Sequence, residues 1–294
     1  MYKCSGHEDE RKLISMFNES MRAFFNENGY VVARALFDPQ EVDTLREHYM
    51  ELRAQGAHPG DMVGVDTTSS DPLKRFPRMI HMHHWDEASL SWLLEPRLNA
   101  VLTGLLGREP YAVQTMLYFK PAGARGQALH QDQYFLRARP GTCMAAWLAL
   151  DDCDETNGCM QVIPGSHTWP LLCTTQADTK NSFTDVTVLL PEGQEVQPIV
   201  MQAGDVLFFN GTLVHGSYPN TTGDRFRRSL IGHYISGEAE QASQFMKPIL
   251  RMDGSEVDLE TSLLGGPCGV WVEEDGKPVI ELSGLETNTV FRSE

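Results

Sequence analysis

Residues 127–167, QALHQDQYFLRARPGTCMAAWLALDDCDETNGCMQVIPGSH, combine a candidate metal-ligand pair with a strand-rich pattern. This stretch places His130 and Asp132 two positions apart, ahead of two apolar segments that are typical of strands. In an extended chain, residues i and i+2 project from the same face, so this imidazole and this carboxylate can reach one metal ion. They are two of the three ligands of a facial iron site, so we expect a second histidine elsewhere in the chain.

The same His-x-Asp spacing occurs twice more in the chain. His7 and Asp9 lie in the polar segment SGHEDERK, and His84 and Asp86 precede a helical segment. Asp86 is the expected N-cap of that helix. Neither pair is framed by strands, so we expect only the pair in residues 127–167 to bind metal.

The composition is that of a globular protein. With 294 residues and 41% hydrophobic content, the chain can bury a sizeable core. No apolar run approaches the roughly 20 residues of a membrane helix, and the first residues lack the apolar segment of a signal peptide. We therefore expect a cytoplasmic protein without membrane contact. The net charge of −16 disfavours nucleic acid as a partner. The sequence does not indicate an oligomeric state.

Six cysteines are spread irregularly along the chain, without a C-x-x-C motif. This spacing argues against a zinc site and against a dense disulfide framework. We expect reduced, mostly buried thiols at Cys4, Cys143, Cys153, Cys159, Cys173 and Cys268.

Residues 1–108 are expected to form a helical flank. Apolar spacing and capping residues predict helices over 8–28, 38–56 and 86–106, with a short strand at 30–38. Residues 57–80 lack periodicity, and loops of this length are often lids or binding elements. His81, His83 and His84 follow directly. A second metal site there is the less favoured alternative to a surface or cleft-lining role.

From residue 111 the pattern changes to short strands separated by Pro, Gly and Asp or Asn turns. This pattern predicts a mainly β fold, an antiparallel jelly roll of the cupin-like, double-stranded β-helix type. The expected core is 109–237, with an insertion at about 168–196, and 238–294 form an extension with a hairpin turning at Asp275 and Gly276. No repeat or linker interrupts the chain, so we expect one domain over 1–294.

The third ligand should follow a later strand that faces the same cavity. His215 closes the segment AGDVLFFNGTLVH and meets this requirement. A metal of this kind needs electrons from a co-substrate, and 2-oxoglutarate would need an arginine for its distal carboxylate. The segment GDRFRRSLIGHY offers Arg225, Arg227 and Arg228. Strand alternation places the last two on opposite faces but does not say which face is inward.

Several motifs together resemble the phytanoyl-CoA dioxygenase family of iron(II)- and 2-oxoglutarate-dependent oxygenases. They are QTMLYFKP, LHQDQYF, AAWLALDD, NGCMQVIPGSH, HGSYPN and RRSLIGHY, and the likeness spans about residues 20–240. The resemblance implies that His130, Asp132 and His215 bind iron, and that Arg227 and Ser217 hold the distal carboxylate. It further implies that Met116, Trp147, Gln114 and Gln127 line the co-substrate pocket.

The resemblance also implies an activity. Fe(II), 2-oxoglutarate and dioxygen would serve to hydroxylate or otherwise oxidise a small molecule, as in bacterial secondary or catabolic metabolism, with ascorbate as the reductant in an assay. Since Asp132 occupies the position that a halide would need, hydroxylation or desaturation is favoured over halogenation. Two alternatives remain, a non-catalytic cupin-like binding or sensor protein and a metal oxygenase or isomerase that does not use 2-oxoglutarate.

The likeness ends in the loop 57–85, in the insertion 168–196 and after residue 240. We expect these segments to determine the substrate. Within the loop, Arg75, Arg78, His81 and Trp85 are proposed to face a polar, partly flat molecule through hydrogen bonds and stacking.

Overall fold

The computed structural model describes residues 17–263 and 267–286. Among them, eight strands form a major sheet in the order β1-β10-β5-β12-β3-β14-β15, with β2 paired to β3. These strands are β1 (Tyr30–Ala33), β2 (Met79–Ile80), β3 (Tyr111–Lys120), β5 (Cys143–Ala149), β10 (Val206–Asn210), β12 (Arg227–Ile235), β14 (Ile249–Leu250) and β15 (Glu256–Val257).

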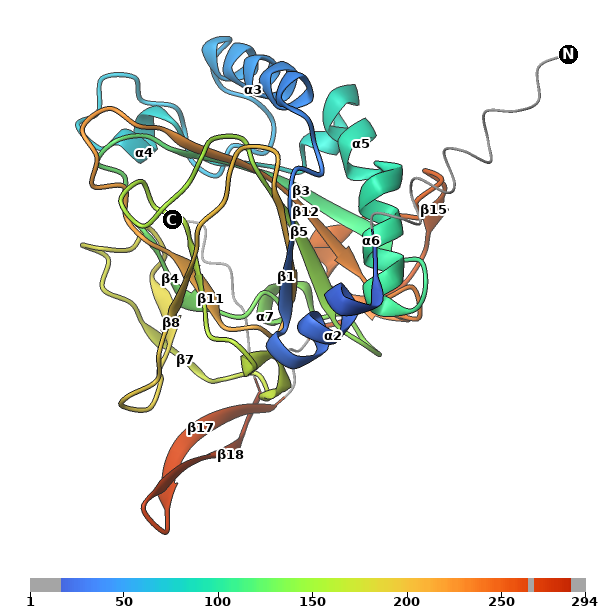
Figure 1. The fold of residues 1–294 in the computed structure, drawn as a ribbon, viewed down its shortest axis with the longest axis vertical. Helices are drawn as coiled ribbons and strands as arrows, with labels where there is room; N and C mark the ends of the chain where they lie inside the picture. Colours follow the sequence, from blue (N-terminus) through green and yellow to red (C-terminus); the bar gives the residue numbers. More distant parts are fainter. Residues whose placement is uncertain (1–16, 264–266, 287–294) are drawn as a thin grey trace, which may run out of the picture.

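A minor sheet faces the major one. Within the described residues it has four strands in the order β4-β11-β6-β9, namely β4 (Gln127–His130), β11 (His215–Ser217), β6 (Met160–Val162) and β9 (Gln197–Ile199). Figure 1 shows β4 and β11 on one side of the major sheet and helices α5 and α6 on the other. Pairing is antiparallel throughout both sheets. The predicted jelly roll is confirmed.

The major sheet is covered on both faces, so its central strands are apolar rather than alternating. All residues of β5 are buried. Leu148 and Leu230 belong to the core on the helical side, whereas Trp147 and Ile231 pack between the two sheets. Because neighbouring residues of a strand point to opposite faces, the odd-numbered residues of β12 from Arg227 to His233 face the minor sheet.

The helical flank packs on the outer face of the major sheet. Its helices are α2 (Glu19–Asn28), α3 (Pro39–Ala54), α5 (Glu87–Leu93) and α6 (Pro96–Leu106). Asp38 and Glu41 form a capping box at the start of α3, and Asp86 caps α5. Gly29 and Gly107 end α2 and α6 in the left-handed conformation. Among all the residues that the structure describes, no helix is both long enough and apolar enough to span a membrane.

Regular structure forms in the predicted loop 57–80 and in the insertion 168–196. In 57–80 the structure forms the one-turn helix α4 (Pro72–Arg75), and β2 then joins the major sheet. The insertion 168–196 carries the hairpin of β7 (Thr174–Gln176) and β8 (Val186–Val188). Both strands are too short to show a clear period in the sequence. Of the first predicted helix, residues 8–16 lie outside the described residues.

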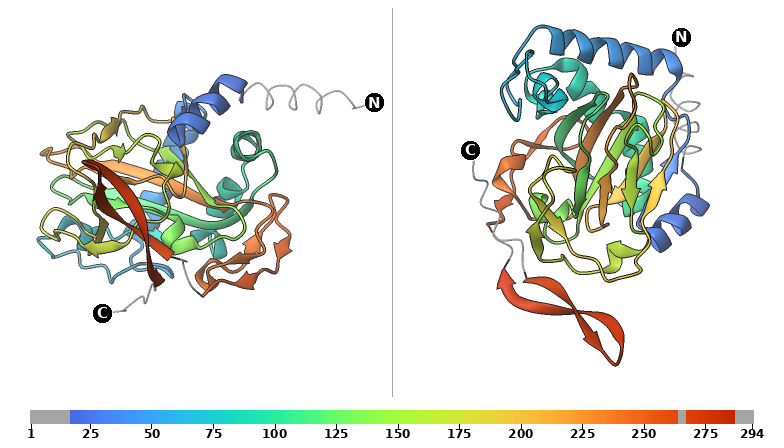
Figure 2. Two further views of the ribbon diagram at one scale, coloured as in Figure 1. Left: turned by 90° about the horizontal axis from the view of Figure 1, so that it is seen from below. Right: turned by 90° about the vertical axis from the view of Figure 1, so that its left-hand side faces the viewer.

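The C-terminal part contributes to the major sheet through β14 and β15, so it is more than an extension. The predicted hairpin is confirmed as β17 (Pro267–Glu274) and β18 (Lys277–Glu286), with positive φ at Asp275 and Gly276. Figure 2 shows it projecting from the rest of the molecule. Further pieces are β13 (Gln241–Ala242), β16 (Glu260–Thr261), α7 (Gln133–Leu136) and the single turns η1 (Met82–His84), η2 (Ser166–Thr168) and η3 (Gln244–Met246).

The expectation of reduced cysteines is wrong for one pair. Cys173 and Cys268 form a disulfide that joins the insertion to the hairpin strand β17. Their separation of 95 residues gives no sequence signal of the pairing, because spacing alone does not fix which cysteines meet. Cys143, Cys153 and Cys159 are free and buried, as expected.

Tyr234 ties the helical flank to the strand that carries the functional side chains. Its hydroxyl is fully buried and donates to the carbonyl of Leu93 at the end of α5, at 2.8 Å. Tyr234→Phe should lower the free energy of unfolding by about 1–3 kcal/mol, because a buried carbonyl loses its donor. Chemical denaturation measures this change.

The matched control is Tyr111→Phe, the same change on a half-buried ring of β3, which should alter stability by less than about 0.5 kcal/mol. Equal losses in both variants would show that the hydroxyl of Tyr234 does not anchor the flank.

Candidate metal centre and its cavity

The centre is built on a cross-strand pair of histidines. His130 ends β4 and His215 begins β11, and the two residues lie directly opposite each other in the antiparallel register. Their ring centroids are 4.2 Å apart. Opposite residues of an antiparallel pair project to the same face, so both imidazoles point towards the major sheet.

Each imidazole is held by its own backbone. Nδ1 of His130 lies 2.9 Å from the carbonyl oxygen of Ala128, and Nδ1 of His215 lies 2.9 Å from that of Leu213. A carbonyl oxygen only accepts, so each Nδ1 carries the proton and donates it. The Nε2 lone pairs are therefore left for a metal ion, in the tautomer and orientation that metal-binding histidines require.

Asp132 supplies the carboxylate, although the local geometry differs from the prediction. β4 ends at His130, and Asp132 has helical backbone angles (φ −62, ψ −32) at the start of α7. The expectation that both residues project from one extended strand is therefore wrong. The turn still brings Oδ1 of Asp132 to 3.4 Å from Nε2 of His130 and 3.6 Å from Nε2 of His215.

A further histidine, missed in the sequence, contacts the same carboxylate. Nε2 of His233 on β12 lies 3.3 Å from Oδ2 of Asp132, and the His233 ring is buried. The two oxygens of Asp132 thus face different partners, one the ligand histidines and one His233. In the pattern RRSLIGHY, His233 stands two residues after Ile231, so strand alternation places both side chains on the same face as Arg227. This alternation is the signal that could have revealed His233.

Burial and charge together set the protonation of the centre. Burial lowers the pKa of His215 to about 4, with His130 adding to the effect, so this imidazole is neutral at pH 7. Burial would raise the pKa of Asp132, but His215, His130 and His233 outweigh it and hold that pKa well below its usual value. A neutral imidazole and an ionised carboxylate are the forms that bind metal.

The centre opens into a cavity of about 570 Å³ between the two sheets. Its wall includes every residue that the sequence predicted for the co-substrate, namely Gln114, Met116, Gln127, Trp147, Ser217 and Arg227. The amide nitrogen of Gln127 lies 3.1 Å from Nε2 of His130. The structure therefore brings these side chains together around one space.

Arg227 is the inward-facing arginine. Its guanidinium is buried, donates to Oγ of Ser229 at 2.7 Å and stacks 5.2 Å from the centroid of the Trp147 ring. Nε of Arg227 has no hydrogen-bond partner among the described residues. Arg228, on the opposite face, forms a bidentate pair with Asp151, and Arg225 pairs with Asp154. Of these three arginines, Arg227 is therefore the one that lines the cavity with hydrogen-bonding capacity to spare.

A second buried cation, also missed in the sequence, lies next to Arg227. Lys120 is 1% exposed, and its ammonium donates to Oγ of Ser217 at 2.7 Å and to the carbonyl of Tyr218 at 2.6 Å. Burial, together with the charge of Arg227, lowers the pKa of Lys120 well below its usual value. No carboxylate pairs with either cation among the described residues.

The four proposed substrate residues separate into two pairs. Arg78 and His81 line the cavity. Trp85 and Arg75 do not, because the Trp85 ring packs against the helical core and stacks on His58, and Arg75 is exposed at the end of α4.

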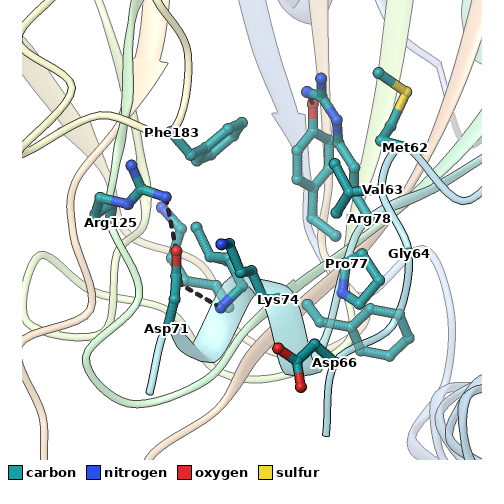
Figure 3. A pocket seen from close by; sticks show the side chains of 14 residues that line it. Met62, Val63, Gly64, Asp66, Asp71, Lys74, Pro77, Arg78, Arg125 and Phe183 are labelled. Carbon is teal, nitrogen blue, oxygen red and sulfur yellow. Dashed lines mark hydrogen bonds and ion pairs between the residues drawn. The ribbon is translucent and has the colours of Figure 1, made fainter. Parts of the chain in front are cut away.

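A second pocket, of about 470 Å³, adjoins the first. Met62, Arg78 and Tyr118 line both, so the pockets share a wall. Figure 3 shows the second pocket, with Arg125 and Asp71 joined on one side and Met62, Val63 and Arg78 on the other. The Arg78 guanidinium donates to the Tyr118 hydroxyl at 3.2 Å and lies 5.5 Å from the centroid of the Phe183 ring. Arg78 thus stands at the boundary between the metal cavity and the second pocket.

Comparison with known proteins gives one family. The family model described as "Phytanoyl-CoA dioxygenase (PhyH)" matches residues 25–229. The chain is 27% identical to the peroxisomal phytanoyl-CoA dioxygenase of Rattus norvegicus, over 76% of this chain and 69% of that protein. It is 26% identical to phytanoyl-CoA dioxygenase 1 of Oryza sativa subsp. japonica, over 76% of this chain and 90% of that protein.

Solved structures share the fold. The epimerase SnoN in complex with Fe3+, alpha ketoglutarate and nogalamycin RO superposes with a TM-score of 0.62 at 22% identity, over 79% of this chain and 86% of that chain. EctD from S. alaskensis gives a TM-score of 0.63 at 22% identity, over 84% of this chain and 88% of that chain. At these identities the likeness shows the fold alone.

His233→Ala should lower the affinity for Fe(II) by about 10–100-fold, because Asp132 would lose the partner that orients it. Removing a ligand itself, in His130→Ala, Asp132→Ala or His215→Ala, should abolish binding at this centre. Anaerobic calorimetric titration measures both effects, and circular dichroism confirms that each variant folds.

The control is His167→Ala, which changes a histidine that contacts the end of α2 and not the cavity. Iron binding by His233→Ala at the strength of the unchanged protein would show that His233 does not orient Asp132.

Proposed function

Because the chain belongs to the phytanoyl-CoA dioxygenase family, we propose that it is an Fe(II)- and 2-oxoglutarate-dependent dioxygenase that oxidises a small molecule. The observation that carries the proposal is one cavity with two unlike ends. One end holds His130 and Asp132, with His215 completing the centre, and the other holds the buried Arg227, which lies next to the buried Lys120. A metal chelator that also carries a distant carboxylate matches both ends.

The iron fits the donor set of the centre. Two imidazoles that carry their protons on Nδ1 and one ionised carboxylate form a facial triad, which leaves the remaining coordination positions open. When bound, iron(II) would supply the activation of dioxygen with electrons from 2-oxoglutarate. The chain's own contribution is to fix three ligands by Ala128, Leu213 and His233 and to keep the site between two sheets, away from bulk water.

The distal carboxylate of 2-oxoglutarate fits the cationic end. Burying a guanidinium without a counter-ion is costly, and Arg227 keeps an unpaired Nε in the cavity. A carboxylate there would accept from Arg227, and the hydroxyl of Ser217, which lines the same cavity and accepts from Lys120, is proposed to contribute. Trp147 stacks on the guanidinium and Met116 covers the same wall. Gln114 and Gln127 are proposed as further polar contacts.

The substrate is proposed to enter from the side of the second pocket. The metal cavity has the size of a small-molecule site and is lined mostly by apolar and aromatic side chains. Arg78 and His81 supply polar groups on its wall, so we propose these two as substrate-facing residues. Arg75 and Trp85 are no longer proposed for this role. Neither nucleic acid nor membrane is proposed as a partner, and a cytoplasmic location remains part of the proposal.

The outcome of oxidation is proposed to be hydroxylation or desaturation, because the Asp132 carboxylate occupies the position that a halide would need. Proteins of the same fold are described as a carbocyclase and an epimerase, so the fold alone does not choose the outcome.

The direct test is 2-oxoglutarate decarboxylation by the purified protein with Fe(II), dioxygen and ascorbate, without added substrate. The proposed dioxygenase should release succinate slowly, and Asp132→Ala should release none. A protein that binds Fe(II) at the centre but forms no succinate, with or without a library of small molecules, would be the binding or sensor protein instead.

Arg227→Ala should raise the KM for 2-oxoglutarate by about 10–150-fold. A charge-assisted bidentate pair contributes about 1.5–3 kcal/mol, and about 1.4 kcal/mol corresponds to a tenfold change. Arg227→Lys should recover only part, for want of the second hydrogen bond. Initial rates of succinate formation measure the effect.

Arg228→Ala is the matched control, since that neighbour faces the helices and pairs with Asp151. It should leave the KM nearly unchanged even if it lowers stability. A large increase in KM for Arg228→Ala and none for Arg227→Ala would refute the assignment.

Arg78→Ala should lower the stimulation of 2-oxoglutarate turnover by a substrate found in a small-molecule screen, by about tenfold or more. The reason is the loss of a hydrogen-bonding and stacking cation between the two pockets. Turnover without substrate should stay within about twofold, because Arg78 contacts neither the ligands nor Arg227.

Arg75→Ala provides the control in the same loop, three positions away and outside the cavity. Equal losses in Arg75→Ala and Arg78→Ala, or an equal loss of turnover without substrate, would mean that the loop supports the fold and does not recognise the substrate.

A further inference from the structure

A second histidine cluster lies where the loop 57–85 meets the major sheet. His81, His83 and His84 occupy a single turn, η1 and the residue before it, directly after β2. One nitrogen of each ring lies within 4.8 Å of the others. The ring centroids of His83 and His84 are 4.3 Å apart, and those of His81 and His84 are 5.2 Å apart.

His83 is fixed in a way that leaves one nitrogen free. The residue is 5% exposed, and its Nδ1 lies 3.0 Å from Oγ1 of Thr115, which also accepts from the His83 backbone at 3.1 Å. Nε2 of His83 is buried and has no hydrogen-bond partner among the described residues. Thr115 therefore orients the ring, and where Nδ1–H donates to its hydroxyl the Nε2 lone pair is available.

His81 is held in a related way by Gln114, the residue before Thr115 in β3. Its Nε2 lies 3.2 Å from the amide nitrogen of Gln114, and its Nδ1 is buried without a partner among the described residues. The amide of Gln114 can present its oxygen by a flip, and Nε2–H then donates to it. His81 also has a positive φ of 54, which a residue other than glycine adopts only where the surroundings enforce it.

Two orphaned ring nitrogens in one cluster need an explanation, because buried polar atoms in native proteins are nearly always paired. Burial, together with the neighbouring rings of His84 and His81, lowers the pKa of His83 to about 3. Burial, with His84 and His233, lowers that of His81 to about 4.

We propose that His81, His83 and His84 form a second metal site that binds one Zn2+ ion. Three imidazoles without a carboxylate suit zinc or a similar transition metal, and they do not suit Mg2+ or Ca2+, which prefer oxygen ligands. Three protein ligands leave a fourth, tetrahedral position for water or for a donor atom of a bound molecule.

The site is separate from the iron centre but adjoins its cavity. His81 and Gln114 line the cavity wall, whereas the ring of His84 is exposed and gives the ion access from solvent. Zinc would pin the end of the loop 57–85 to β3 and fix the His81 ring on that wall. The proposal does not depend on the oxidation chemistry, since it rests on histidines that the iron centre does not use.

The test is calorimetric titration of the metal-free full chain with Zn2+, supported by the absorption spectrum of the Co2+ form. The unchanged protein should bind about two ions per chain, one at each site, and Asp132→Ala should keep one. His84→Ala removes an exposed ligand without disturbing the core and should weaken the second site more than about tenfold. Thr115→Val should weaken it by about 10–100-fold. The Co2+ spectrum of Asp132→Ala should be tetrahedral.

His167→Ala serves as the control and should bind both ions with unchanged affinity. The proposal is overturned if the unchanged protein binds a single ion that Asp132→Ala loses, or if the second ion binds only at millimolar concentration. It is equally overturned if His84→Ala and Thr115→Val, both folded by circular dichroism, bind the second ion as tightly as the unchanged protein does. Loss of succinate formation would not bear on it.

Discussion

The centre depends on the register between β4 and β11. Opposite pairing places His130 and His215 on one face with their rings in contact. A shift of one residue would send one imidazole to the outer face of the minor sheet and destroy the site. β6 pairs with the other edge of β11, with Val162 opposite His215, so the register of β11 is fixed from both sides. The two ligand histidines are thus a consequence of sheet pairing, and the carboxylate is brought to them by the turn into α7.

The second constraint is the double cover of the major sheet. β12 is buried on both faces, one against the helices and one against the minor sheet. Arg227 and Arg228 consequently meet different surroundings although they are neighbours. Arg228 finds Asp151 and is neutralised within the protein, whereas Arg227 faces the cavity beside Lys120. Two buried basic side chains without a carboxylate partner lower the stability of the protein when no anion is bound. Binding of an anion beside them would restore that stability.

Much of this arrangement could be predicted from local pattern. The change from helical to strand periodicity near residue 111, the capping residue Asp38 and the turn at Asp275 and Gly276 are local signals, and each agrees with the structure. His130 could be chosen over His84 because strands frame it.

Most of the misses are long-range, although the helical turn at Asp132 is a local one. Nothing in the sequence pairs Cys173 with Cys268, and β14 joins the major sheet across more than a hundred residues. The inward face of β12 could not be chosen, because both of its faces are apolar. Lys120 has no local motif and acquires its role only when β3 and β11 come together. The alternation along RRSLIGHY hints at an inward His233, but its contact with Asp132 forms only when β12 packs against the turn into α7.

The histidine turn at 81–84 depends on long-range pairing in the same way. In sequence it follows an irregular loop and lacks a strand frame, but in the structure β2 pairs with β3 and delivers the turn to the sheet. Gln114 and Thr115 are consecutive in β3, so their side chains leave opposite faces. Gln114 meets His81 on the cavity side, and Thr115 meets His83 on the helical side. The turn therefore straddles the sheet, and any ion that it holds would connect the cavity wall with the helical flank.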